Sequence, residues 1–308
     1  MLSTRCQVIY QAYGLNIKSE LPLPEIPMKV PEGEDIDITI KLDDLTKLWN
    51  EVVEPNRHFY VRDNTVLFQI PNTATYYVMN GKQIIVSPMD GTHADKVRLY
   101  ILGTCMGALL MQRKILPLHG SAIAINEKAY AIVGDSGAGK STLASAFLNK
   151  GYELISDDVI PVAFSNGIIP MVSPSYPQQK LWQQSLDAFG MESKGYIPIF
   201  DRETKFAVPV ESKFVSKSLP LKGVFELVKT GTDEVMITPI ASLQRLHTLF
   251  CHTYRNFLID RLGLRDWHFS ITANIADKIQ LYQLQRPINR FTAHDLTSLI
   301  LNTINEGE

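Results

Sequence analysis

The chain has 308 residues, of which 45% are hydrophobic and 20% are charged, a composition typical of a globular protein with one or two domains. Its 30 basic and 32 acidic residues nearly cancel and are spread along the chain, so nucleic acid is not an expected partner. Three widely separated cysteines without a C-x-x-C spacing fit a reducing, cytoplasmic location.

The first part of the chain consists of short β-strand patterns separated by turn residues. These patterns are "DIDITIKL", "HFYVRDNTVLFQI", "TYYVMN" and "KQIIVSP", and Gly81 marks a hairpin between the last two. The proline-rich segment 21–34 predicts an irregular surface loop or linker. We therefore expect a β-rich N-terminal domain over residues 1–92.

A helix is predicted over residues 94–113. Its apolar run, 99–111, is shorter than the ~18 residues that a membrane span needs, so we expect a buried helix and no membrane partner. Buried strands are predicted at 116–125 and 129–133. The sequence places the domain boundary only approximately, between residues 90 and 118. We assign residues 93–308 to a second, catalytic domain.

The rest of the chain alternates between strand and helix patterns. Strands are expected at 159–164, 223–230 and 234–240, and helices at 178–190 and 242–263, with a turn at "SNG". The fold class that this alternation predicts is α/β or α+β.

A phosphate-binding pattern lies between the predicted strand 129–133 and a helical pattern that ends at Gly151. Residues 134–142 read "GDSGAGKST", which fits G-x-x-x-x-G-K-[ST] in the strand–loop–helix order that the motif requires. The loop amides and the start of the helix would surround a polyphosphate, and the lysine adds a charge. The predicted cofactor-binding residues are Gly134, Asp135, Ser136, Gly137, Ala138, Gly139, Lys140, Ser141 and Thr142, with the Ser141 hydroxyl placed to bind Mg²⁺.

Two adjacent carboxylates, Asp157 and Asp158, follow the strand pattern "YELIS" and are expected at its end, beside the phosphate loop. A kinase needs one carboxylate near Mg²⁺ and another to accept the proton of the attacking hydroxyl. Their spacing does not decide which does which, and Mn²⁺ stays an alternative metal. His119, which lies ahead of the predicted strand 129–133, could approach the same region, but a single histidine is a weak signal of function.

The motifs "LHGSAIAI", "GDSGAGKST" and "ELISDD" resemble, over residues 116–162, the catalytic domain of HPr kinase/phosphorylase. That family is related to phosphoenolpyruvate carboxykinase through its phosphate-binding core. The resemblance implies an ATP-dependent kinase that phosphorylates a serine hydroxyl. It assigns phosphate and metal contacts to Lys140 and Ser141, places Asp157 nearer the metal, and makes Asp158 the base, paired with His119.

The chain departs from that family after the acid pair, where its glycine-rich signature is missing. This puts phosphorolysis and a hexameric assembly in doubt, although a homo-oligomer stays compatible with the sequence. The segments "YGLNIKSELPLPEI", "PSYPQQKLW" and "PINRF" instead resemble HPr-kinase-like proteins of lasso-peptide biosynthesis. That looser resemblance implies phosphorylation of the C-terminal serine of a precursor peptide.

Three further cations are weaker candidates for phosphate or substrate contacts, because charge near a γ-phosphate stabilises the transition state: Lys180, Arg202 and Lys205. Two other functions remain open. One is a protein-serine kinase that acts on a folded carrier of the HPr type, and the other is a nucleotide-gated binding module without catalysis. The module would need the phosphate loop but not Asp158 or His119.

Overall fold

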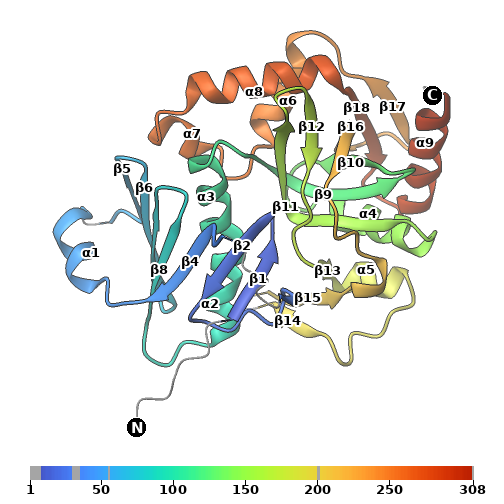
Figure 1. Cartoon of the computed structure of the whole chain (residues 1–308). Coiled ribbons are helices and arrows are strands. Elements are labelled where there is room, and N and C mark those ends of the chain that lie inside the picture. Colours follow the sequence, from blue (N-terminus) through green and yellow to red (C-terminus); the bar gives the residue numbers. More distant parts are fainter. Residues whose placement is uncertain (1–7, 30–34, 55, 200–201, 307–308) are drawn as a thin grey trace. The chain divides into compact units, whose positions relative to one another are not determined.

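The structure, a computed structural model, describes residues 8–29, 35–54, 56–199 and 202–306 (Figure 1). Contacts divide the chain into two compact units. Unit 1 comprises Met1–Ile115 with Arg255–Trp267, and unit 2 comprises Leu116–Tyr254 with His268–Glu308. The contacts divide the chain after Ile115. The domain boundary between residues 92 and 93 stays a prediction from the sequence.

Unit 1 is built on an eight-stranded sheet with the strand order β3-β1-β2-β4-β8-β7-β6-β5. Its strands are β1 Val8–Ala12, β2 Leu15–Ser19, β3 Met28–Lys29, β4 Ile38–Leu42, β5 Phe59–Arg62, β6 Thr65–Ile70, β7 Ala74–Met79 and β8 Gln83–Pro88. The predicted hairpin at Gly81 is confirmed, since β7 and β8 pair in antiparallel fashion and both Asn80 and Gly81 have positive φ.

The sequence predicts an irregular segment over residues 21–34, but part of this segment forms a strand. Met28 and Lys29 form the short strand β3, because β1 offers them a free edge. Residues 30–34 lie outside the described residues.

The helical segment of unit 1 confirms the predicted buried helix. It consists of α2 Ala94–Tyr100, a π-helical turn Ile101–Cys105 and α3 Met106–Gln112. The hydroxyl of Tyr13 donates to the carbonyl of Leu102 over 2.6 Å and so joins the sheet to this helix. Unit 1 also contains α1 Thr46–Val52 and α7 Phe257–Arg261. Within the described ranges, no helix combines the length and apolarity that crossing a bilayer requires.

Unit 2 contains a seven-stranded sheet with the order β10-β9-β11-β12-β16-β18-β17, in which β10 also pairs with β16. Its strands are β9 Leu116–Ile125, β10 Lys128–Val133, β11 Glu153–Ser165, β12 Ile169–Val172, β16 Leu219–Thr230, β17 Met236–Pro239 and β18 Gln280–Pro287. A three-stranded sheet adds β13 Gln178–Trp182, β14 Ile197–Ile199 and β15 Arg202–Pro209. Because β10, β16 and β18 run parallel, their carboxyl ends meet at one edge.

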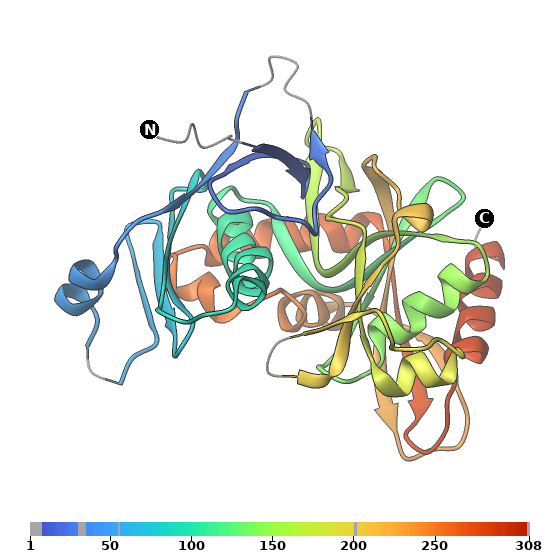
Figure 2. The same cartoon turned by 90° about the horizontal axis from the view of Figure 1, so that it is seen from below.

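Helices complete the mixed α/β fold that the sequence predicts. Those with residues in unit 2 are α4 Lys140–Asn149, α5 Gln183–Ala188, α6 Leu243–Cys251, α8 Arg265–Lys278 and α9 Ala293–Glu306, with a 3₁₀ turn at Glu211–Lys213. Figures 1 and 2 show α4 and α9 beside each other against the sheet. Leu143 and Phe147 of α4 share a buried core with Leu296 and Ile300 of α9. This packing fixes the helix that follows the phosphate loop.

Two predicted helices are corrected. Residues 178–190 form strand β13 and then the short helix α5, because Lys180 and its neighbours pair with β15. Residues 242–263 form α6 and α7, separated at Arg255, whose φ is 53°. Tyr254 donates its backbone N–H to Pro117 at 2.8 Å instead of continuing α6.

The position of the acid pair is also corrected. Asp157 and Asp158 do not end a strand but lie within the 13-residue strand β11. They pair with Ser121 and Gly120 of β9, and the register shifts between Leu154 and Ser156. Polar residues inside a strand look like a strand end when only the sequence is considered.

Candidate active site

The phosphate loop connects β10 to α4 and has the backbone that its glycines allow. Gly134, Gly137 and Gly139 have φ values of 146°, 78° and 107°, which side chains rarely permit. A Cβ on Gly134 would lie 2.5 Å from the carbonyl oxygen of Leu227 in β16. The tight turn therefore depends on glycine, and it brings the loop amides to the start of α4.

Lys140, the first residue of α4, is buried and turns back on its own loop. Its Nζ donates to the carbonyl oxygens of Gly134 and Asp135 over 2.8 and 3.0 Å. Burial lowers the pKa of Lys140, while Asp157 and Asp158 oppose that shift. The ammonium group thus lies where a phosphate could replace carbonyl oxygens as its partner.

Asp157 is buried and holds three hydrogen bonds. Its Oδ1 accepts from the hydroxyls of Ser121 and Ser141 at 2.6 and 3.1 Å, and its Oδ2 accepts from the backbone N–H of Lys180 at 2.9 Å. Ser141 and Asp157 therefore present adjacent oxygen ligands beside the phosphate loop. Mg²⁺ prefers one or two protein oxygens together with phosphates and water, so this pair fits it.

No group of three His, Cys, Asp or Glu side chains that could hold a metal occurs in the part of the chain that the structure describes. The Ser141–Asp157 pair suits a metal that arrives with a nucleotide.

Asp158 lies next to Asp157 but faces different partners. Its φ of 74° is unusual for aspartate and departs from strand alternation. Its Oδ2 lies 2.6 Å from Nζ of Lys180, and its Oδ1 lies 3.6 Å from Nδ1 of His119. Burial by itself would raise the pKa of Asp158, but Lys180 and His119 outweigh it and lower this pKa below its usual range. The carboxyl group is therefore ionised at neutral pH.

His119 is held on two sides. Its backbone N–H donates to the carbonyl of His252 over 2.7 Å, and its Nδ1 lies 3.1 Å from the carbonyl oxygen of Asp158. Since a carbonyl only accepts, Nδ1 carries the proton in this arrangement. Burial lowers the pKa of His119, while Asp158 opposes the shift. The ring packs against that of Tyr254, with 5.5 Å between centroids.

The structure thus brings together the main residues that the sequence singled out: Lys140, Ser141, Asp157, Asp158 and His119. Lys180 joins them as the ion-pair partner of Asp158, and burial of this lysine is outweighed by Asp158, which raises its pKa.

Lys205 lies 5.5 Å above the ring of Trp182, and its charge adds to the stronger influences that lower the pKa values of Asp158 and Lys140. The side chain of Arg202 lies outside what the structure describes. The Thr142 hydroxyl lies 2.7 Å from that of Ser185 in α5.

Two cations beside the loop were missed by sequence reasoning. Arg286 of β18 donates Nε to the carbonyl of Ala138 over 2.8 Å, and Nζ of Lys229 in β16 lies 3.9 Å from where a Cβ on Gly137 would be. The two residues are register partners on adjacent strands. Single basic residues form no sequence motif. The two cations could have been predicted only if the parallel pairing of β16 with β18 had been predicted first.

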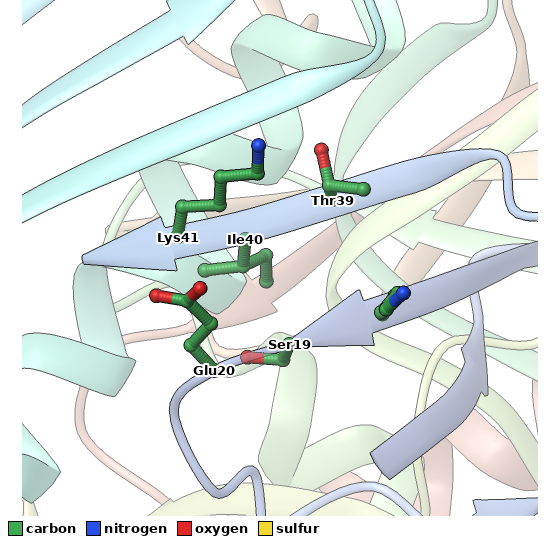
Figure 3. Close-up of a pocket in the computed structure, with 6 residues that line it drawn as sticks. Ser19, Glu20, Thr39, Ile40 and Lys41 are labelled. Atoms are coloured by element: carbon green, nitrogen blue, oxygen red, sulfur yellow. The ribbon is translucent and has the colours of Figure 1, made fainter. Parts of the chain in front are cut away.

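A separate pocket in unit 1 is lined by residues of β2, β4 and the turn after β2: Lys18, Ser19, Glu20, Thr39, Ile40 and Lys41 (Figure 3). The Glu20 carboxylate accepts from the backbone N–H of Leu42 at 2.9 Å, so it is occupied by its own sheet. None of the predicted site residues lines this pocket.

Comparison with known proteins agrees with the motifs. No family model matches the chain. The HPr kinase/phosphorylase of Mycoplasmopsis pulmonis (strain UAB CTIP) is 39% identical over 70 residues, which are 22% of this chain and 23% of that protein. The chain thus matches less than a quarter of the length of this curated relative. The resemblance of the sequence to HPr kinase/phosphorylase is confirmed over that stretch.

Among solved structures, the Hpr(Ser) kinase/phosphatase from Coxiella burnetii matches 62% of this chain and 91% of its own. The sequence identity is 14% and the TM-score is 0.35.

Proposed function

We propose that the chain is an ATP-dependent serine kinase that transfers the γ-phosphoryl group directly to a hydroxyl. The observation that carries this proposal is the placement of Asp158 between His119 and Lys180, one residue from the Asp157–Ser141 pair. A binding module needs the phosphate loop and the metal ligands, but it has no use for a second, ionised carboxylate beside them. The similarity to an HPr kinase/phosphorylase supports the same chemistry.

In the proposed reaction, Asp158 accepts a hydrogen bond from the substrate hydroxyl and takes its proton as the oxygen attacks the γ-phosphorus. The bond from the γ-phosphorus to the bridging oxygen breaks, and the diphosphate leaves within the loop amides and Lys140. Mg²⁺, held by Ser141 and Asp157, would neutralise charge on the phosphates. No covalent intermediate with the protein is needed.

The low pKa of Asp158 suits this role in one respect and limits it in another. The carboxylate is always ready to orient the hydroxyl, but it is a weak base. Phosphoryl transfer passes through a loose transition state in which positioning and charge matter most, so weak basicity is tolerated. Lys180 is close enough to Asp158 to turn toward the transferred group as the proton arrives.

For the substrate, we propose a peptide, specifically the C-terminal serine of a lasso-peptide precursor. This finer assignment rests on the loose resemblance of residues 13–26, 174–182 and 287–291. A folded carrier of the HPr type is the alternative, favoured by the similarity to the relative from Mycoplasmopsis pulmonis.

Intact-mass measurement tests both assignments. The protein is incubated with Mg-ATP and, separately, with a precursor peptide ending in Ser, the same peptide ending in Ala, and an HPr protein. We expect the mass of one phosphate to be added to the Ser peptide only. Phosphate on HPr alone would replace the peptide assignment with the carrier assignment. Phosphate on neither, with ATP still bound, would favour the binding module.

A further inference from the structure

Three aromatic side chains of unit 2 form a cluster outside the main core. The rings of Phe189 and Phe291 lie 5.4 Å apart at 80°, and both pack against His294, at 5.9 and 5.8 Å. The exposed fraction of Phe291 is 43%, and His294 is also exposed. Edge-to-face contacts leave ring faces uncovered, so the cluster presents apolar aromatic surface to solvent.

The first of these rings is tied to the helix that follows the phosphate loop. Phe189 directly follows α5, and its backbone N–H bonds to Ser185. The hydroxyl of Ser185 lies 2.7 Å from that of Thr142, in the first turn of α4. One short helix therefore links the Phe189 ring to the residue after the metal-binding serine.

The other two rings are tied to the loop itself. Phe291 and His294 lie in and just after the connection from β18 to α9. At the end of β18, Arg286 donates to the carbonyl of Ala138, inside the loop. Arg290 of this connection forms an ion pair at 2.6 Å with Asp295 in the first turn of α9. Two independent hydrogen bonds thus place the cluster beside the phosphate-binding segment.

The position matches what a nucleotide needs. With its outer phosphates in the loop, a nucleotide continues past the first turn of α4, where Thr142 faces α5. Beyond the phosphates it carries a flat base that gains from stacking on aromatic rings. The cations Arg286 and Lys229 lie between the sheet and the loop, and neither has an ion-pair partner among the described residues.

We propose that Phe189, Phe291 and His294 form the platform on which the purine base of the nucleotide stacks. This inference rests on the proposed function, since it places the rest of the nucleotide whose phosphates occupy the loop. Because stacking tolerates any base, it predicts that GTP binds by the same rings as ATP.

The test compares two ligands by calorimetry with the full chain: ATP and inorganic tripolyphosphate, both with Mg²⁺. Phe291→Leu should weaken ATP binding about tenfold or more, as expected for loss of one base–aromatic stack. Tripolyphosphate, which has no base, should bind unchanged. Phe291→Trp keeps a ring and should retain ATP affinity.

A matched control is available in Phe250 of α6, which is 44% exposed and packs against the ring of His268. Phe250→Leu should leave both affinities unchanged. Wild-type ATP affinity in both Phe291→Leu and Phe189→Leu would overturn the platform, as would an equal loss of ATP and tripolyphosphate, which indicates a disturbed loop.

The two proposals fail in distinguishable ways. If the wild-type chain binds tripolyphosphate as tightly as ATP, the base makes no contribution, so the platform is wrong while the phosphate loop stands. If it binds neither ligand, the proposed kinase function fails and the platform fails with it.

Discussion

Lys180 contacts both members of the acid pair, and it does so with different atoms. Its backbone N–H donates to Oδ2 of Asp157 over 2.9 Å, while its Nζ lies 2.6 Å from Oδ2 of Asp158. One residue of β13 therefore orients the proposed metal ligand and balances the charge of the proposed base. This relationship separates two neighbouring aspartates into different roles.

Removing the Lys180 charge should move the pH dependence of transfer. Transfer requires ionised Asp158, and Lys180 helps to keep the pKa of that carboxyl below the usual ~3.9. In Lys180→Met the opposing effect of burial remains, so the pKa rises and the acid limb of kcat/KM should shift to higher pH. Lys180→Arg keeps the positive charge, so the acid limb of its kcat/KM profile should lie at the same pH as in the wild type. A Lys180→Met variant that is active with an unshifted limb would contradict this prediction.

Asp158→Asn should abolish transfer but spare nucleotide binding. Loss of a positioned base typically costs about 10²- to 10⁴-fold in rate. ATP affinity should change little, because the loop and the Ser141–Asp157 pair remain. Single-turnover transfer and calorimetry measure the two effects, with the exposed Asp233→Asn as a control that should behave like wild type. Full transfer by Asp158→Asn would remove the base assignment.

Changes to the metal pair should raise the Mg²⁺ concentration that transfer requires. Ser141→Ala removes one of two adjacent oxygen ligands, and Asp157→Asn removes the negative charge of the other. Because both act through one ion, their effects should not add in the double variant. A Mg²⁺ titration of initial rates measures this. An unaltered half-saturating concentration in both single variants would mean that the metal binds elsewhere.

Lys140→Ala should weaken ATP binding by roughly 10- to 100-fold, the range expected for loss of a charged hydrogen bond of about 1.5–3 kcal/mol. Lys150 at the other end of α4 provides the control, because its Nζ donates to the exposed Ser298 hydroxyl at 3.1 Å. Lys150→Ala should bind ATP as the wild type does. Calorimetry compares the two, and equal affinities would argue against the phosphate loop.

A steric prediction concerns stability rather than activity. A Cβ on Gly120 of β9 would collide with the backbone carbonyl of Ile132 in the neighbouring strand. Gly120→Ala should therefore destabilise unit 2 by about 1–3 kcal/mol, as overpacking does. Gly231→Ala has open space around it and should change stability by no more than about 0.5 kcal/mol. Thermal unfolding distinguishes the two, and equal midpoints would contradict the predicted close approach.

Elements with a strong local signal were predictable. The buried helix of residues 94–112 carries a long apolar run, and the hairpin at Gly81 and the strand–loop–helix at Gly134–Lys140 combine apolar strand patterns with glycines of positive φ. Short apolar runs were not predictable in this way. Residues 178–182 form a strand only because β15 pairs with them.

By itself, the sequence determined the phosphate loop, because its glycines and Lys140 act through local backbone conformation. It also determined that Ser141, Asp157, Asp158 and His119 belong to one set, through the order of their motifs. Only the tertiary structure decided how the set divides. Pairing of β11 with β9 directs Asp157 to Ser121 and Ser141, and the positive φ of Asp158 directs it to His119 and Lys180. The sequence offers Lys180 only as one of three weaker candidates and does not point to Arg286. The contacts of both residues depend on pairing between distant segments.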